Sequence, residues 1–301
     1  MKKGMMVYGA LQGGLLCVLL CGASCTRQKL EYRIPAGYVT VELSWEDGAE
    51  PAGSRIWFYP TAGGSALARE GSARGFEGML PPGDYRVIAA NSDAQHVGFR
   101  SMDRYETAEF YVEEDASDNT CISQPTDMYL STGEASGLLT VVDRDSVGMR
   151  LLGRSCIRRV HLRFDIESSV ATVTSCRGRL SGVSASIYGA TGAATGRSAE
   201  VCFAARPAEE EGTFQADITV LDLVQPSDAP TQVVDLVLTK EDGTDVPTEV
   251  DLTDAIRSQI DASGGELPDE ISLEVTLRSV DGELQAAVDP WDMGGSGSGD
   301  L

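Results

Sequence analysis

The chain is poor in basic residues and in histidine. Its 301 residues include 24 lysines and arginines against 46 aspartates and glutamates, so the formal net charge is −22 at pH 7. Because binding to nucleic-acid phosphates depends on an excess of Lys and Arg, this balance argues against a nucleic-acid partner. The only histidines, His96 and His161, exclude a site that needs several imidazoles. With 42% hydrophobic residues, the chain still has enough apolar material for a folded core.

Long apolar runs are also missing. The densest run, Leu15–Leu20, is much shorter than the ~20 residues that a transmembrane helix needs. It fits a signal peptide, because Lys2–Lys3 precede it and the small residues Gly22–Ser24 follow it. Small residues directly before Cys25 resemble the lipobox of bacterial lipoproteins. The alternative is an ordinary secretory signal that is cut at the same place.

The lipobox resemblance implies that Cys25 becomes the N-terminus and carries the lipid. Removal of residues 1–24 takes two lysines and no acidic residue with it, so the net charge becomes still more negative. Anionic head groups would repel such a body. The expected partner is therefore the membrane, and acyl chains rather than a basic patch must hold the protein there.

Few cysteines remain beyond this segment, namely Cys121, Cys156, Cys176 and Cys202. Oxidising compartments permit disulfides, and four cysteines allow three complete pairings. Cys156 and Cys176 flank a predicted hairpin that turns near residues 167–169, so this pair could face each other across it. The alternative is that all four are buried thiols, which pack as small hydrophobic side chains.

What the chain does have is alternation of apolar and polar residues. Apolar residues alternate with polar ones at Val39, Val41, Leu43 and Trp45, which predicts a half-buried strand. Further strands are expected over residues 55–59, 85–90, 106–112, 138–142, 160–166, 180–188, 201–203, 214–220, 233–238, 271–277 and 284–288. The small, Gly-rich stretch Thr61–Ser72 predicts a loop. Strands recurring at short spacing are typical of β-sandwiches.

One short helix is predicted near the C-terminal end of the chain. Apolar residues recur there at helical spacing, at Leu252, Ile256 and Ile260. Asp251 or Thr253 could cap its first turn, and Ser263–Gly265 would end it. The expected fold class is therefore all-β, with two Greek-key sandwiches of the transthyretin or immunoglobulin kind and one short helix in the second.

A change of composition indicates where the two sandwiches divide. The acidic, polar stretch Glu113–Thr120 and the small, polar stretch Ser131–Gly137 favour a linker or domain edge near residue 132. We expect a signal peptide over residues 1–24 and a tether over 25–37. The two sandwiches are expected over 38–132 and 133–292, and a disordered tail over 293–301.

No group of residues predicts catalysis, a metal or a cofactor. Gly189–Ser198 is rich in small residues like a phosphate-binding loop, but Arg197 stands where that motif has Lys. Asp143–Arg154 opens like a calcium loop, but Arg154 stands where a bidentate Glu is needed. We therefore expect a protein that is not an enzyme, and the residues identify no small-molecule ligand.

Trp57 and Tyr59 share one face of a predicted strand, with Trp45 nearby in the sequence, and aromatic side chains of this kind raise the alternative of a platform for sugar rings. Ile56 and Phe58 occupy the opposite face of the strand that carries Trp57. A strand that is apolar on both faces is typical of a buried position. The pattern therefore favours core packing over sugar binding.

Several segments together resemble a known family. They are the lipobox-like Cys25 and the stretches Gly37–Trp45, Ile56–Pro60, Leu80–Ile88 and Val288–Trp291. The whole resembles an uncharacterised family of Bacteroidales lipoproteins that is similar to the fimbrillin superfamily and its minor fimbrial anchor subunits. The likeness covers most of residues 26–292, and it consists of the general pattern of alternating strands and of short motifs.

The resemblance implies a non-catalytic, lipid-anchored protein of the outer membrane that acts as a fimbrial anchor or accessory subunit. Its partners would be fimbrial subunits, bound by addition of a strand to a sheet edge. The basic, polar Thr26–Lys29 leaves both the periplasmic and the cell-surface face open, since surface lipoproteins of this lineage often carry acidic residues there. Asp145–Val147 resembles a short O-glycosylation motif centred on Ser146. The alternative function is a glycan-binding lipoprotein beside an outer-membrane nutrient importer.

Overall fold

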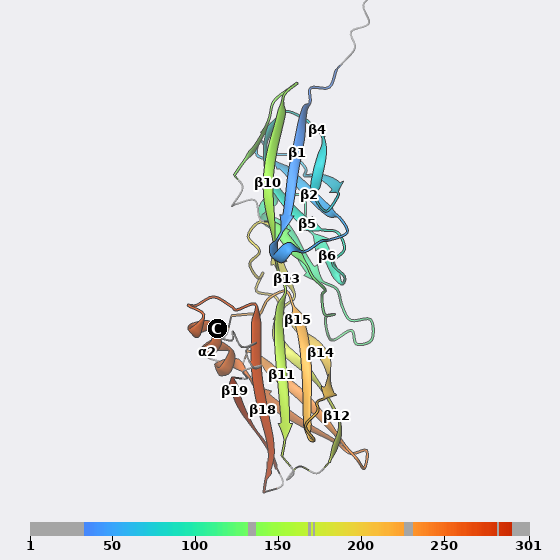
Figure 1. Cartoon of the computed structure of the whole chain (residues 1–301), viewed down its shortest axis with the longest axis vertical. Coiled ribbons are helices and arrows are strands. Elements are labelled where there is room, and N and C mark those ends of the chain that lie inside the picture. The colour runs from blue at the N-terminus through green and yellow to red at the C-terminus, as the bar shows by residue number, and fades with distance from the viewer. Residues whose placement is uncertain are drawn as a thin grey trace, which may run out of the picture. The chain divides into compact units, whose positions relative to one another are not determined.

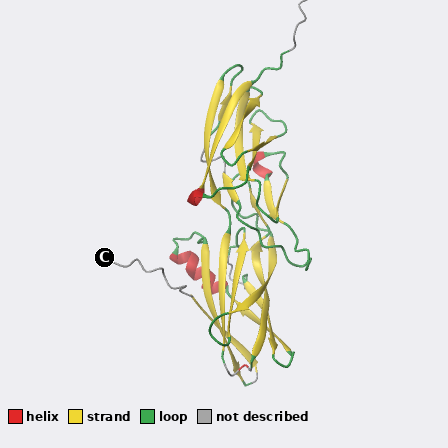
Figure 2. Ribbon diagram, turned by 45° about the vertical axis from the view of Figure 1, so that its right-hand side comes forward, coloured by secondary structure: helices red, strands yellow, loops and turns green. Residues whose placement is uncertain are grey.

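The computed structural model describes residues 33–131, 137–167, 170, 172–225, 231–281 and 283–290. The described residues from Pro35 to Pro290 belong to one compact unit. This unit consists mainly of strands (Figure 1). Its one α-helix in these ranges is α2 (Thr253–Ala262), drawn as the longest red coil in Figure 2. The all-β prediction is confirmed.

The first half of this unit is an eight-stranded sheet folded over its own core. Its order is β3-β2-β5-β8-β10-β1-β4, with β9 beside β5. The strands are β1 (Gly37–Trp45), β2 (Ser54–Pro60), β3 (Leu67–Gly71), β4 (Gly75–Leu80), β5 (Gly83–Asn91), β8 (Tyr129–Ser131), β9 (Leu139–Val141) and β10 (Ser146–Ser155). Phe58 and Leu80 are fully buried in this core. A bridge between Ser72 and Gly75 joins β3 to β4, so the sheet closes on itself at that side.

The second half repeats this construction. Its sheet has the order β17-β16-β12-β14-β15-β11-β18-β19. The strands are β11 (Arg158–Ile166), β12 (Val173–Ser184), β14 (Ser198–Pro207), β15 (Thr213–Val220), β16 (Val233–Lys240), β17 (Asp245–Asp251), β18 (Glu270–Val280) and β19 (Glu283–Pro290). Phe164 and Leu180 lie in its fully buried core. Strands β14 and β15 pair only through Arg206–Gln215 and Pro207–Phe214.

A small third sheet joins the two halves. It has the order β13-β7-β6 and consists of β6 (Val97–Arg100), β7 (Glu109–Val112) and β13 (Ser186–Tyr188). Strand β13 comes from the second half of the chain, and it pairs with β7 from the first. A third apolar cluster covers this sheet and includes Trp57, Phe110, Ile187 and Leu221.

The predicted helix is confirmed at its expected place. Ile256 and Ile260 are buried against the second core, as their spacing requires. The side chain of Asp251 accepts a hydrogen bond of 2.9 Å from the Thr253 N–H, so this carboxylate satisfies one of the free donors of the first turn. The helix ends before Ser263.

Two expectations about organisation are wrong. Residues 61–72 include a strand, β3, which pairs with β2 over Leu67–Gly71. The sheets also do not divide near residue 132, because β9 and β10 both belong to the first sheet. Strand β10 runs parallel to β1 from Tyr38–Ser146 to Trp45–Gly153, which holds it in the first core. The chain enters the second sheet only between Ser155 and Arg158.

Candidate interaction site

The predicted lipid site lies outside the described residues. Cys25, the signal peptide over 1–24 and most of the tether over 25–37 all precede Arg33, and the tail over 293–301 lies beyond Pro290. Across the described ranges, no helix has the length and apolar character to cross a membrane. Lipid attachment therefore stays a prediction.

The predicted disulfide between Cys156 and Cys176 is wrong. The structure instead bonds Cys121 to Cys202, with 5.8 Å between their Cα atoms, and leaves Cys156 and Cys176 free. The predicted hairpin does not exist, because β11 pairs with β15 and β18 while β12 pairs with β14 and β16. Burial raises the pKa of the Cys176 thiol to about 12, and this side chain packs in the second core as a small hydrophobic group. Cys156 is half-buried and packs beside the apolar cluster of the third sheet.

The disulfide fastens a segment of the first half to the second half. Ile122 forms a bridge to Val201 of β14, and its N–H donates to the Glu200 carbonyl at 2.8 Å. Gln124 contacts both β14 and β15, which pair with each other at only two positions. Its Nε2 donates to the Cys202 carbonyl of β14, and its Oε1 accepts from the Thr219 N–H of β15. Residues 121–125 thus fill the place between β14 and β15 where these strands do not pair.

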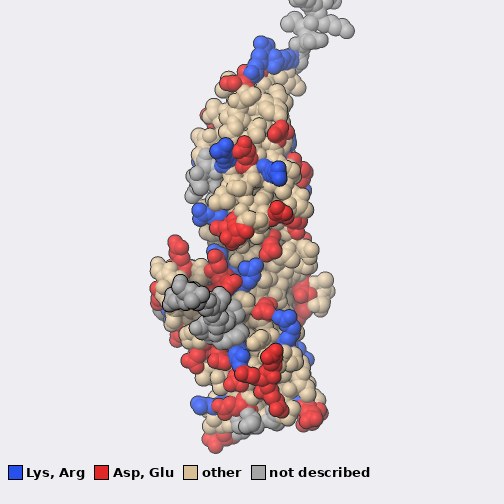
Figure 3. All heavy atoms as spheres, viewed as in Figure 1, with Lys and Arg blue, Asp and Glu red and all other residues tan. Residues whose placement is uncertain are grey.

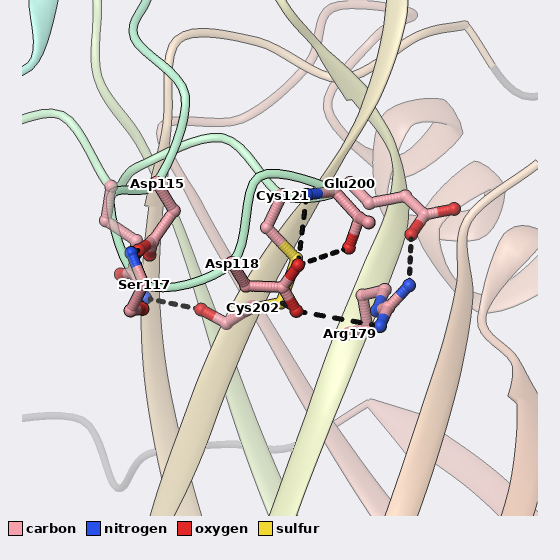
Figure 4. Close-up of a disulfide and its surroundings, with 9 residues drawn as sticks. Asp115, Ser117, Asp118, Cys121, Arg179, Glu200 and Cys202 are labelled. Carbon is pink, nitrogen blue, oxygen red and sulfur yellow. Dashed lines mark hydrogen bonds and ion pairs between the residues drawn. A yellow bond between two sulfur atoms is a disulfide. The ribbon is translucent and has the colours of Figure 1, made fainter.

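Charged side chains surround the disulfide (Figure 4). Asp118 accepts hydrogen bonds from the Thr120 N–H and hydroxyl, which lower the pKa of its carboxyl. Arg179 lies within ion-pair distance of both Asp118 and Glu200. Asp118 and the two sulfurs lie within 4.8 Å of one another, the spacing of a metal site. Since the sulfurs are bonded to each other, they provide no thiolate for a metal.

A buried carboxylate strengthens the third sheet. Glu109 on β7 receives two hydrogen bonds from Arg100, of 2.5 and 2.9 Å, and one of 2.5 Å from the Ser186 hydroxyl on β13. The Arg100 hydrogen bonds are the main reason why the Glu109 pKa falls to about 2. This charged group therefore joins strands from both halves of the chain.

The tryptophans form no exposed platform in the described ranges. Trp45 is 8% exposed and donates through Nε1 to the Ala73 carbonyl at 2.7 Å. Trp57 is 3% exposed and makes edge contacts with Phe99 and Phe110. Core packing of both is confirmed, while Trp291 lies outside the described residues. The glycan-binding alternative would depend on solvent-exposed tryptophans, and Trp45 and Trp57 are both buried.

Two of the sequence motifs have structural roles. The calcium-like stretch Asp143–Arg154 is a turn followed by most of β10. The Gly-rich stretch Gly189–Ser198 connects β13 to β14, with an isolated bridge between Ile187 and Ala194. Ser146, the predicted O-glycosylation residue, is exposed at the start of β10, and its glycosylation stays a prediction.

Two strands of the second sheet have a free edge among the described residues. Strand β17 pairs only with β16, and β19 pairs only with β18. Free edges expose backbone donors and acceptors that an added strand can use. Sequence reasoning identified the strand at 284–288 but not its edge position, which depends on pairings between distant residues.

The charge of the surface gives no alternative docking patch on the visible face. Figure 3 shows acidic side chains distributed along that face, with basic ones interspersed. Many of the described arginines pair with carboxylates, including Arg55 with Glu70 and Arg177 with Asp245. Interspersed charges of both signs do not make the broad basic surface that attracts phosphates or anionic lipids.

Comparison with known proteins gives one family match. A model described as "Domain of unknown function (DUF5119)" matches residues 24–204, which is more than half of the chain. One curated relative, from Bacteroides ovatus, carries the provisional name of fimbrium anchoring subunit Fim4B. It is 35% identical over 107 residues, which are 35% of this chain and 32% of that protein. The match therefore spans about a third of either protein.

Solved structures share the fold. The fimbrial anchor protein Mfa2 from Porphyromonas gingivalis superimposes with a TM-score of 0.57 at 17% identity, over 85% of this chain and 97% of that one. A Bacteroides ovatus protein provisionally described as an adhesin gives a TM-score of 0.60 at 18% identity, over 86% and 90% of the chains. At these identities the likeness concerns the fold alone.

Proposed function

We propose, from the premise that this chain belongs to the DUF5119 family, that it is a non-catalytic fimbrial anchor or accessory subunit. The carrying observation is the 35% identity to the relative named as a fimbrium anchoring subunit. The shared fold with the anchor Mfa2 supports the same role. The protein would bind fimbrial subunits by strand addition, for which the second sheet offers the edges of β17 and β19 among the described residues.

Lipid attachment at Cys25 would hold the protein at the outer membrane. The argument rests on the sequence, in which a charged start, an apolar run and small residues lead to this cysteine. Two or more acyl chains provide stable anchoring. The tie between the two halves supports an anchoring role, because a pull on one sandwich passes to the other through the disulfide and the third sheet.

The experiment compares Cys25→Ser with Cys21→Ser in cells fed a labelled fatty acid. Cys25→Ser is expected to abolish labelling, to move the protein from the detergent phase to the aqueous phase and to release fimbriae into the medium. Cys21→Ser, which removes the neighbouring cysteine of the signal segment, should behave like the unchanged chain. Continued labelling of Cys25→Ser would exclude this residue as the lipid site. Fimbriae that stay on cells lacking the whole protein would refute the anchoring role.

A further inference from the structure

The two free edges of the second sheet differ in the direction of their backbone groups. In a strand, the N–H and C=O of one residue point to the same side, and successive residues alternate. Two hydrogen bonds show which residues of β17 point toward β16. The Leu252 N–H donates to the Gln232 carbonyl at 2.8 Å, and the Lys240 N–H donates to the Thr244 carbonyl at 2.9 Å. Even-numbered residues of β17 therefore face β16, and odd-numbered ones face outward.

The outward positions of β17 are unsuited to an added strand. They are Asp245, Pro247, Glu249 and Asp251. Proline has no N–H to donate, and charged side chains on an edge are the usual protection against unwanted pairing. This edge is closed by its own sequence.

For β19, the direction of the backbone groups follows from the hydrogen bonds of the neighbouring strand β18. The Glu167 N–H donates to the Leu277 carbonyl at 2.9 Å and the Arg159 N–H to the Asp269 carbonyl at 2.8 Å, so odd-numbered residues of β18 face β11. Even-numbered residues then face β19, where Thr276 stands opposite Ala287. Odd-numbered residues of β19 thus take the ladder hydrogen bonds.

The outward N–H groups of β19 therefore belong to Leu284, Ala286 and Val288. The stretch Leu284–Val288 contains neither proline nor charge. Pro290 also faces outward, beyond the last of these donors. In sequence and geometry this edge is open where β17 is closed.

Helix α2 sets the limit of the open stretch. Gln259 of α2 donates through Nε2 to the Ser272 carbonyl at 2.9 Å, at the end of β18 that lies opposite the C-terminal end of β19. This side chain satisfies a carbonyl that β19 does not reach. Figure 1 shows α2 at that end of β18, so the free stretch is Leu284–Val288, about 17 Å long.

The side chains of β19 indicate what an added strand must provide. Leu284 and Val288 are partly buried and pack against the second core, and Ala286 between them is exposed. An added strand would continue this inner face. Its residues that point to the core side must therefore be apolar, and those on the other side must be polar.

We propose that the outer edge of β19, over Leu284–Val288, accepts an extended segment of another fimbrial subunit with apolar side chains at alternate positions. The proposal rests on the proposed function and names the contact through which it works. Each outward N–H of the edge donates to a carbonyl of the incoming strand. The β17 edge takes no part.

The first test is hydrogen–deuterium exchange on the purified full chain. The amides of Leu284, Ala286 and Val288 should exchange as fast as exposed ones, while those of Gln285 and Ala287 should be protected by the ladder with β18. Protection of all five in the isolated chain would overturn the proposal, because another part of the chain would already cover the edge. This measurement needs no variant.

The second test is Ala286→Pro in fimbriated cells. The substitution removes one outward N–H and no ladder bond, so the level and the thermal midpoint of the chain should stay unchanged. Because an unmade buried hydrogen bond weakens binding by about tenfold or more, shed fimbriae should increase by about that factor. Ala286→Ser keeps the N–H, and Glu249→Pro removes an outward N–H from β17, so both should retain fimbriae.

A strain that lacks the protein separates the outcomes. If that strain sheds fimbriae and Ala286→Pro does not, the edge assignment is wrong and the anchoring role stands. If the strain lacking the protein keeps its fimbriae, the proposed function itself fails. If Glu249→Pro sheds as many fimbriae as Ala286→Pro, the choice of β19 over β17 is refuted. Should Ala286→Pro lower the thermal midpoint, the exchange measurement decides the proposal.

Discussion

The two sandwiches are built alike but closed differently. In each, a parallel pair joins strands that are far apart in the sequence, β1 with β10 and β11 with β18. The first closes one side with its own chain through the bridge between Ser72 and Gly75. The second leaves β14 and β15 mostly unpaired, and residues 121–125 from the first half fill the opening.

This difference makes the dependence between the halves unequal. The second sandwich needs residues 121–125, which the first half supplies, whereas the first closes without a corresponding segment of the second. Both share the apolar cluster around Trp57 and Ile187. Damage to the first core should therefore spread to the second sandwich more than damage to the second core spreads to the first.

The largest expected effect comes from matched core truncations. Phe58 and Phe164 are both fully buried, one in each core, so Phe58→Ala and Phe164→Ala should each cost about 3–5 kcal/mol of unfolding free energy. Phe58→Ala should shift the unfolding of both halves, and Phe164→Ala chiefly that of the second. In a Trp291→Phe background, tryptophan emission reports only Trp45 and Trp57 of the first half, so urea unfolding followed by this emission and by far-UV circular dichroism separates the two responses. Identical, coincident curves for both variants would contradict the unequal dependence.

The next effect is removal of the disulfide. Cys121 and Cys202 are 81 residues apart, so the double variant Cys121→Ser/Cys202→Ser frees a long loop and should cost about 2–4 kcal/mol. The loss should appear as earlier unfolding of the second sandwich and faster proteolysis within residues 113–125. Cys156→Ala, which removes a free thiol, is the control and should leave the proteolysis rate unchanged. Equal stability of the double variant and the unchanged chain would show that residues 121–125 hold without the disulfide.

The sequence predicted the elements whose signals are local. The helix at 253–262 followed from Ile256 and Ile260 at helical spacing, and it ends directly before Ser263–Gly265, the predicted stop signal. Strand β1 followed from the alternation of apolar and polar residues, and the structure buries the apolar ones, Val39, Val41, Leu43 and Trp45. These patterns report a face that is buried, whatever partner buries it.

The errors concern what buries each face. Strand β10 has apolar residues at Val147, Met149 and Leu151, so its alternation was present in the sequence, but two acidic residues before it resembled a calcium loop. The change of composition placed the division near residue 132, but β9 and β10, which follow it, pair with β5 and β1 of the first sheet. The pairing of Cys121 with Cys202 and the edge position of β19 depend on contacts between residues far apart in the chain, which alternation does not encode.

The third sheet predicts a dependence on acid. Hydrogen bonds from Arg100, and a further one from Ser186, hold the Glu109 pKa at about 2, below its unfolded value. The charged form is therefore favoured by folding, and its contribution is complete above the unfolded pKa and is lost as the pH falls through about 2. We expect a loss of about 3 kcal/mol as the pH falls from the unfolded pKa through about 2. Glu109→Gln should flatten the pH dependence of the unfolding free energy, and Glu106→Gln, at an exposed ion pair, should not.

The smallest effect isolates the side chain that bridges the opening of the second sandwich. Gln124→Ala removes both the hydrogen bond from Nε2 to the Cys202 carbonyl and the one from the Thr219 N–H to Oε1, while the disulfide stays. Because each such bond is worth about 1 kcal/mol net, the unfolding free energy should fall by about 1–2 kcal/mol. The exchange rate of the Thr219 amide should rise at the same time, which places the loss at β15. Gln285→Ala, at an exposed position of β19, serves as the matched control and should change neither quantity. An unchanged exchange rate of the Thr219 amide in Gln124→Ala would mean that the Gln124 side chain is not needed to fill the gap between β14 and β15. The second sandwich would then depend on the first through the main-chain contacts of Ile122 and the disulfide.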